Sequence, residues 1–123
     1  MAQKILILED DDSLARAYMI MMEKEEYLVT QFPNGKKGLE ATKKETFDLI
    51  LLDLVMPGMD GLEFLRLFNP KKHPETKVIV FTNLLSMASM KKAESLGVTK
   101  YISKSDFSPK ETVELVQKTL KTK

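Results

Sequence analysis

Five short apolar runs, separated by segments with helical spacing, constrain the fold of this 123-residue chain more than any other feature. The runs lie at roughly residues 3–8, 27–32, 48–53, 77–82 and 98–103. Runs such as Val78–Phe81 lack polar alternation, which is typical of strands that are buried on both faces. Parallel strands need long crossovers, usually helices. The pattern therefore predicts an α/β fold, with a five-stranded parallel sheet flanked by five helices.

The first and last helical segments carry the clearest signals. An apolar stripe at helical spacing follows the first run and consists of Leu14, Ala17, Tyr18, Met21 and Met22. Asp11, Asp12 or Ser13 can cap the start of this helix. Residues 108–111 read Ser-Pro-Lys-Glu, which places a cap, a first-turn proline and a capping-box glutamate before the last helix. The stripe of that helix consists of Val113, Val116 and Leu120.

Length and charge limit the classes of protein to consider. A chain of this size can bury a core without staples, so we expect one domain over residues 1–123 and no output domain. The absence of cysteine excludes disulfides and thiolate metal sites and suits a reducing cytoplasm. The net charge of +1 and the shortness of every apolar run give no indication of nucleic acid, a membrane span or a signal peptide. We therefore expect a cytoplasmic protein that binds neither nucleic acid nor membrane.

Polar side chains follow four of the five runs where each predicted strand ends. Glu9 and Asp10 come after the first run, and Asp53 closes the third. Thr82 ends the fourth run, and Lys104 follows the fifth. In an open parallel sheet the ligand crevice lies outside the carboxyl ends of the strands. We therefore expect these five side chains to converge on one rim of the sheet.

The chemistry of this set indicates a metal ion and a phosphate. Three carboxylates can supply oxygen ligands to Mg²⁺, which commonly shares a substrate phosphate. A carboxylate such as Asp53 can attack phosphorus and form an acyl phosphate. The Lys104 ammonium and Mg²⁺ would offset the charge of the transferring group, while the Thr82 hydroxyl could donate a hydrogen bond.

Each residue also has a simpler interpretation. Residues 9–12 could be acids that favour a helix N-terminus without any metal, and Asp53 could be an ordinary loop acid. A threonine that ends a strand is usually a good β-former, and a lysine there is usually exposed, so Thr82 and Lys104 gain roles only through their neighbours. The joint pattern favours a site. His73 lies in a Lys-Lys-His-Pro surface loop, and we predict no role for it.

Four segments carry a family resemblance that extends over essentially the whole chain. They are Ile5–Asp11, Asp48–Gly61, Val78–Thr82 and Gly97–Lys104. With these motifs the chain resembles the receiver domains of two-component response regulators. The resemblance implies the flavodoxin-like strand order 2-1-3-4-5, of which a chemotaxis regulator of this family is a known example. It also implies a signalling domain that accepts a phosphoryl group and is not a turnover enzyme.

The resemblance assigns a role to each acid of the rim. Asp53 corresponds to the phosphoacceptor, and Glu9 and Asp10 correspond to the acidic metal pair. The backbone carbonyl of Val55 corresponds to a further Mg²⁺ ligand. The implied phosphoryl donor is a phosphohistidine on a sensor histidine kinase or a histidine phosphotransfer protein.

The same resemblance assigns the residues of the switch. Thr82 corresponds to the switch hydroxyl, Lys104 to the lysine that pairs with the phosphoryl group, and Tyr101 to the aromatic that reports phosphorylation on the surface. The output surface would comprise the fourth helix, the fifth strand and the fifth helix, which could also form a homodimer. A dense set of apolar residues near Tyr101 predicts a Met-rich contact surface or plain core packing: Leu84, Leu85, Met87 and Met90.

Two positions depart from the family pattern. Ser105 stands where proline usually follows the lysine, often through a cis bond, and a non-proline cis bond costs about 2.5 to 4 kcal/mol. We therefore expect a trans bond, with Lys104 aimed differently or on a looser loop. Asn83 stands where alanine or glycine is common and could either bind a phosphate oxygen or obstruct the site. Both departures support an alternative, a pseudo-receiver that binds a partner without phosphorylation.

Two enzyme-type or carrier alternatives fit the sequence less well. A phosphohydrolase of the haloacid dehalogenase type needs a second aspartate two residues after the nucleophile, where this chain has Val55. A flavin or dinucleotide carrier is disfavoured because the first loop has acids in place of a G-x-G-x-x-G pattern, and acids repel phosphate.

Overall fold

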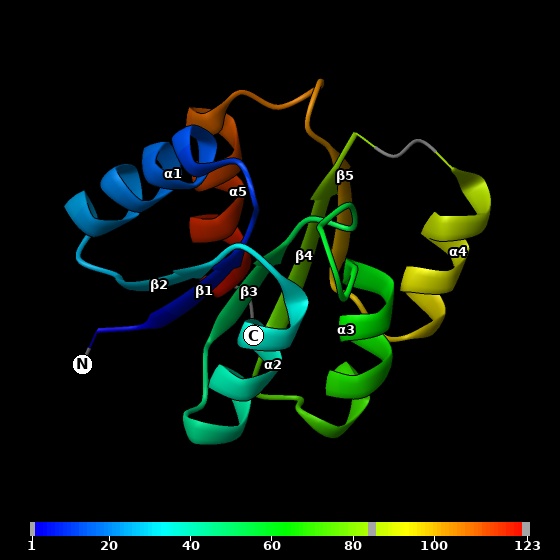
Figure 1. Cartoon of the computed structure of the whole chain (residues 1–123). Helices are drawn as coiled ribbons and strands as arrows, with labels where there is room; N and C mark the ends of the chain where they lie inside the picture. The colour runs from blue at the N-terminus through cyan, green and yellow to red at the C-terminus, as the bar shows by residue number, and fades with distance from the viewer. Residues whose placement is uncertain (1, 84–85, 122–123) are drawn as a thin grey trace.

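The computed structural model describes residues 2–83 and 86–121 as alternating strands and helices (Figure 1). The strands are β1 Lys4–Leu8, β2 Leu28–Phe32, β3 Leu49–Leu52, β4 Lys77–Thr82 and β5 Lys100–Ser103. The helices are α1 Asp12–Lys24, α2 Gly35–Lys44, α3 Gly61–Phe68, α4 Met87–Ser95 and α5 Pro109–Lys121, with a short 3-10 turn at Pro70–Lys72. The five predicted strands are confirmed, and each is slightly shorter than or equal to its predicted range.

The five strands form one parallel sheet in the order β2-β1-β3-β4-β5, as the family resemblance implied. In Figure 1, α1 and α5 lie together on one face of the sheet, and α2, α3 and α4 lie on the other. Strand β1 pairs with β2 on one side and with β3 on the other. The direction in which successive strands are added to the sheet therefore reverses between β1 and β3. In open α/β sheets the ligand crevice forms at such a switch point.

Each face of the sheet contributes alternate strand residues to its own core, so two cores form. Strand β3 is fully buried along its length, which explains why its sequence lacks polar alternation. The buried core beneath α1 and α5 contains Ile5, Ile7, Tyr18, Met22, Leu49, Leu51, Ile79, Phe81, Ile102, Val113 and Val116. The core on the opposite face includes Leu6, Leu8, Ile50, Leu52, Phe64, Leu65, Phe68, Val78, Val80 and Ala93.

The predicted caps of α1 and α5 form. The Asp11 carboxylate accepts the Leu14 N–H at 3.1 Å. Ser108 and Glu111 form a reciprocal capping box, with the Ser108 N–H donating to the Glu111 carboxylate at 3.0 Å and the Glu111 N–H donating to the Ser108 hydroxyl at 3.1 Å. These bonds satisfy backbone donors that a helix start leaves unpaired.

The apolar stripe of α1 is centred differently from its prediction. Tyr18 and Met22 are buried as expected, but Ala15 is buried while Ala17 is half-buried. Positions 15, 18 and 22 follow the three- and four-residue spacing of one helix face, and Ala17 lies beside that face. Within the described ranges, no helix is both long and apolar enough to cross a membrane.

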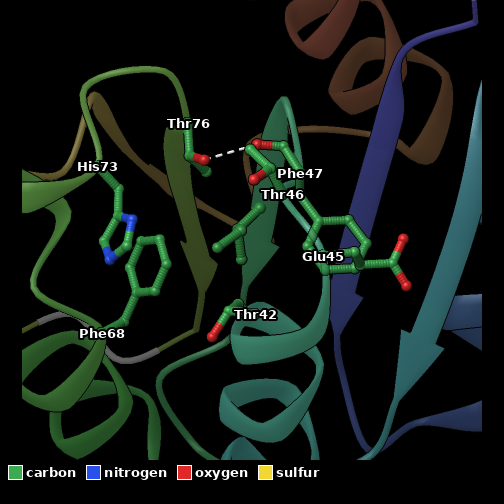
Figure 2. Close-up of a pocket in the computed structure, with 8 residues that line it drawn as sticks. Thr42, Glu45, Thr46, Phe47, Phe68, His73 and Thr76 are labelled. Atoms are coloured by element: carbon green, nitrogen blue, oxygen red, sulfur yellow. Dashed lines mark hydrogen bonds between the residues drawn. The ribbon is translucent and has the colours of Figure 1, made fainter.

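A small cavity of about 60 Å³ lies near the amino ends of β3 and β4, away from the predicted site (Figure 2). Its lining residues are Thr42, Glu45, Thr46, Phe47, Ile50, Phe68, His73 and Thr76. The Thr76 hydroxyl donates to the Phe47 carbonyl at 2.6 Å, and the His73 ring stacks on Phe68 with centroids 4.4 Å apart. His73 therefore packs against Phe68, the last residue of α3, beside this cavity.

Two buried helical glycines allow a matched test of packing near the site. A Cβ on Gly61 would lie 2.5 Å from the Asp53 carbonyl oxygen and 2.6 Å from the Leu54 Cα, both backbone atoms. A Cβ on Gly38 would meet the methyl ends of Leu8 at 2.5 and 2.6 Å, which can rotate. We expect Gly61→Ala to lower the free energy of unfolding by about 1 to 3 kcal/mol and Gly38→Ala by less, measured by denaturant titration. A Gly61→Ala protein as stable as the parent would contradict this packing.

Candidate functional site

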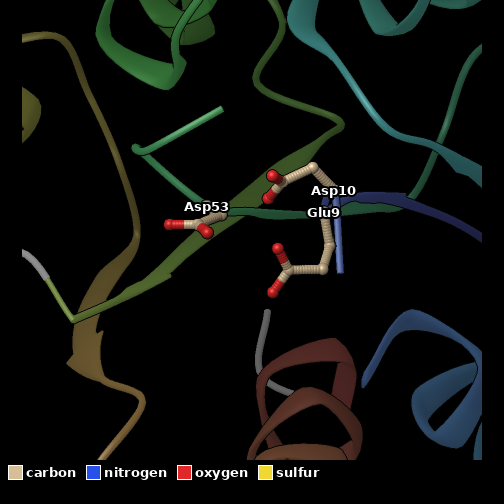
Figure 3. Close-up of side chains that lie close together, drawn as sticks. All are labelled: Glu9, Asp10 and Asp53. Atoms are coloured by element: carbon tan, nitrogen blue, oxygen red, sulfur yellow. The ribbon is translucent and has the colours of Figure 1, made fainter. Parts of the chain in front are cut away.

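Three carboxylates meet at the carboxyl ends of two neighbouring strands (Figure 3). Glu9 follows β1 and Asp53 follows β3, and together with Asp10 they offer oxygen atoms that lie within 4.8 Å of one another. Glu9 is fully buried and Asp53 is 4% exposed, whereas Asp10 is exposed. The predicted convergence of the three acids is therefore present, and two of them, Glu9 and Asp53, lie below the surface.

The sheet itself fixes the backbones of the two buried acids. The Asp53 N–H donates to the Leu8 carbonyl at 3.0 Å, and the Glu9 N–H donates to the Phe32 carbonyl at 3.2 Å. The Gln31 amide donates to the Glu9 carbonyl at 2.8 Å. Both acids thus continue the strand ladders by one step, so the register of β2, β1 and β3 determines where their side chains begin.

Lys104 completes the cluster from the far side of β4. Its ammonium forms ion pairs with Glu9 and with Asp53, the latter at 2.8 Å, and its side chain is only 15% exposed. The Lys104 N–H donates to the Thr82 carbonyl at 3.0 Å, and the ammonium lies 5.0 Å from the centre of the Phe81 ring. No cis peptide bond occurs in residues 2–83 and 86–121, yet Lys104 reaches both acids. The trans bond predicted from Ser105 is confirmed, while a Lys104 aimed differently from that of other family members, or on a looser loop, stays a prediction.

An open depression surrounds Asp53 and brings the remaining predicted residues to one place. Its lining residues are Asp10, Asp53, Val55, Thr82, Asn83 and Lys104. The Val55 N–H donates to one Asp53 oxygen at 3.1 Å, while Val55 is 58% exposed. Thr82 is fully buried at the end of β4, and Asn83 is exposed at the mouth. The structure thus brings together every residue that the sequence predicted for this rim of the sheet.

Burial and charge act against each other in this cluster. Burial raises the pKa of Glu9 to about 7, although the neighbouring Lys104 ammonium lowers it. Burial also opposes the charge on Lys104, but hydrogen bonds to Asp53 and Glu9 raise its pKa above the ordinary value. The cluster therefore holds a firmly protonated lysine and a glutamic acid whose proton is lost near neutral pH.

The donor set of the cluster suits a divalent cation. Three carboxylates face one ammonium, so the cluster keeps excess negative charge once all acids are ionised. All available ligand atoms are oxygens, which are the ligands of Mg²⁺, and exposed Asp10 leaves one side open to water. Glu9, Asp10 and Asp53 could hold such an ion.

The predicted reporter Tyr101 lies on the outer edge of the site. It is half-buried on β5 and lines an apolar groove, here named the α4–β5 groove, with four other residues: Ser86, Met87, Met90 and Ser103. Met87 is 63% exposed, so part of the predicted Met-rich surface is present. The predictions for Leu84 and Leu85 lie outside the described residues.

Sequence reasoning missed the residues that support Lys104. Phe81 was expected only as a core residue, and its ring lies beside the ammonium. Ser103 and Ser105 form a hydroxyl–hydroxyl hydrogen bond of 2.8 Å across Lys104. Ser105 was recognised as a departure from the family, but two serines at a spacing of two residues carry no pattern that predicts such a contact.

The raised pKa of Glu9 predicts a specific dependence of stability on pH in metal-free buffer. Between pH 4.5 and about 7, Glu9 keeps its proton in the folded state but loses it in the unfolded state. The tighter binding of this proton by the folded state stabilises the fold; its contribution is complete below pH 4.5 and disappears as the pH rises through 7. Between pH 5 and 8 the parent should therefore lose stability relative to Glu9→Gln, by roughly 3 kcal/mol at most. Denaturant unfolding at several pH values measures this difference, and parallel curves for the two proteins would contradict the raised pKa.

Comparisons with known proteins agree with this geometry. Residues 5–117 match the family model of the response regulator receiver domain. The chain is 33% identical to the response regulator receiver protein CpdR of Brucella abortus (strain 2308), covering 96% of this chain and 97% of CpdR. It is 36% identical to the transcriptional regulatory protein ResD of Bacillus subtilis (strain 168). The chain spans only 45% of the length of ResD and 43% of the length of YkoG from the same organism. A CheY-like receiver structure from Methanospirillum hungatei JF-1 superimposes with a TM-score of 0.90 at 28% identity, over 98% of this chain and 94% of that one. The chain belongs to the response regulator receiver domain family.

Proposed function

We propose that this domain accepts a phosphoryl group on Asp53 and thereby switches a partner-binding surface. One observation carries the proposal: Asp53 is only 4% exposed, lines a surface depression, and its carboxylate contacts the Lys104 ammonium at 2.8 Å. The donor would be a phosphohistidine on a sensor histidine kinase or a histidine phosphotransfer protein. We propose the cytoplasm as the compartment in which the two proteins meet.

The residues around Asp53 suit attack on phosphorus. A carboxylate oxygen would form the new P–O bond while the P–N bond of phosphohistidine breaks, and the imidazole would leave as its proton is restored. The Val55 N–H and the Lys104 ammonium hold the two Asp53 oxygens at 3.1 and 2.8 Å, which fixes the direction of the carboxylate. Lys104 would also offset charge on the phosphoryl oxygens.

The metal and switch residues complete the proposed chemistry. Glu9, Asp10, Asp53 and the Val55 carbonyl would hold Mg²⁺, which supplies positive charge next to the phosphoryl group when it is bound. The Thr82 hydroxyl would donate a hydrogen bond to the phosphoryl group. Since Thr82 ends β4 beside β5, its movement would favour a second arrangement of the α4–β5–α5 surface and of Tyr101. That surface would bind a downstream partner or a second copy of the chain.

Phosphorylation by a small acyl phosphate in the presence of Mg²⁺ tests the acceptor. We expect intact mass to rise by one phosphoryl group in the parent, because small donors need no kinase docking, and we expect no rise in Asp53→Asn. Asp60→Asn is the matched control: Asp60 is exposed in the same loop and caps α3, and asparagine caps a helix equally well. This control should gain the group.

Two outcomes would contradict the acceptor role. A parent that gains no group would favour the alternative of a pseudo-receiver, which Asn83 at the mouth of the depression already suggests. A group that persists in Asp53→Asn would place the acceptor elsewhere.

Magnesium binding can be tested without phosphorylation. Because Mg²⁺ would bind only the folded cluster, adding it should raise the free energy of unfolding, by about 2.7 kcal/mol at a concentration of one hundred times the Kd. Asp10→Asn removes one ligand and should lose most of this gain. Asp12→Asn changes an exposed acid in the first turn of α1 and should keep it. Equal gains in the two variants, or none in the parent, would exclude the cluster as the metal site.

A further inference from the structure

The segment Ser103–Ser105 carries Lys104 from the end of β5 into the acidic cluster. Lysine has a long stem with many rotamers, so its ammonium keeps one position only if the backbone at its base is fixed. One anchor is the Lys104 N–H, which donates to the Thr82 carbonyl at 3.0 Å. That bond holds one side of the residue and leaves the following turn to be held by other groups.

Ser103 supplies those groups. Its hydroxyl oxygen accepts the Ser105 N–H at 3.3 Å and shares a 2.8 Å hydrogen bond with the Ser105 hydroxyl. Its carbonyl accepts the Asp106 N–H at 3.2 Å. Three contacts thus start from Ser103 and close the turn over Lys104. A serine hydroxyl that binds the backbone two residues onward is a known way to stabilise a turn.

We propose that the Ser103 hydroxyl, acting through Ser105, is a positioning group that aims the Lys104 ammonium at Asp53 and Glu9. This inference rests on the proposed function for its effect on rate, because Lys104 is the group that would offset phosphoryl charge. Ser103 touches neither Asp53 nor Glu9 in the hydrogen bonds of the described residues, so it acts only through the lysine. Loss of its hydroxyl should therefore loosen Lys104 and leave the acids in place.

A simpler interpretation is that Ser103 only stabilises β5. Ser103 pairs with Thr82 at the end of the strand and lines the α4–β5 groove. A purely structural role would change the unfolding midpoint and would act whether or not a lysine follows. The two interpretations differ in whether the effect of Ser103 depends on Lys104, which a double-mutant cycle measures directly.

The experiment measures the rate of phosphorylation by a small acyl phosphate, with saturating Mg²⁺, in a set of variants. Ser103→Ala should lower the rate about three- to tenfold, since small misplacements of a charged group are costly in transition states. Ser103→Thr keeps the hydroxyl and should restore the rate to within about twofold of the parent. In a Lys104→Ala background, Ser103→Ala should have no further effect. Ser95→Ala removes an exposed hydroxyl that donates to the Lys92 carbonyl and should leave the rate unchanged.

A second measurement separates failure of the inference from failure of the proposed function. In metal-free protein labelled with ¹⁵N-lysine, the ammonium held by Glu9 and Asp53 should give a slowly exchanging side-chain signal, and Ser103→Ala should broaden it. If the parent is never phosphorylated but this signal depends on Ser103, the proposed function fails and the positioning role stands. If the signal is unchanged in Ser103→Ala, or if that variant slows phosphorylation equally without Lys104, the positioning role is wrong.

Discussion

The ion pairs of Lys104 with Glu9 and Asp53 are the interaction on which the site depends. Two carboxylates lie at the ends of adjacent strands with almost no exposure, and an unpaired buried charge is strongly destabilising. The ammonium that compensates them comes from β5, on the far side of β4. The contact therefore ties the first, third and fifth strands together at one rim and makes the electrostatics of the site depend on correct assembly of the whole sheet.

The apolar sheet is what makes that rim chemically distinct. The inner strands are buried on both faces, so they tolerate polar side chains only where the ladders end. At those ends a carboxylate begins from a rigid backbone and sits against hydrocarbon on one side and an open depression on the other. Burial raises the pKa of Glu9, and the fixed backbones limit how far the acids can turn away from one another. Packing of the core and chemistry at the rim are thus two effects of the same strand pattern.

Sequence periodicity predicted the parts of the structure that depend on the backbone. Continuous apolar runs predicted the strands, and their parallel arrangement brought Glu9, Asp53 and Lys104 to one edge, while the strand order came from family resemblance. The hydroxyl contact between Ser103 and Ser105 could not be predicted, because it belongs to a turn that has no periodic signal. The same holds for the stack of His73 on Phe68, since two rings meet there through loop geometry. Ala15 is buried in place of Ala17 because positions 15, 18 and 22 share one face of the helix.

The charge balance of the cluster links three events: protonation of Glu9, binding of a cation, and the proposed phosphorylation of Asp53. Three carboxylates and one ammonium leave excess negative charge, which a proton on Glu9 or a bound cation can reduce. A phosphoryl group on Asp53 would add further negative charge and would compete with Glu9 for the single ammonium of this cluster. Lys104 cannot serve both groups equally, so a cation bound to Glu9 and Asp10 would free the lysine for the phosphoryl group. A metal ion bound there would therefore do more than offset the charge of the phosphoryl group, because it would replace the partner that Glu9 loses.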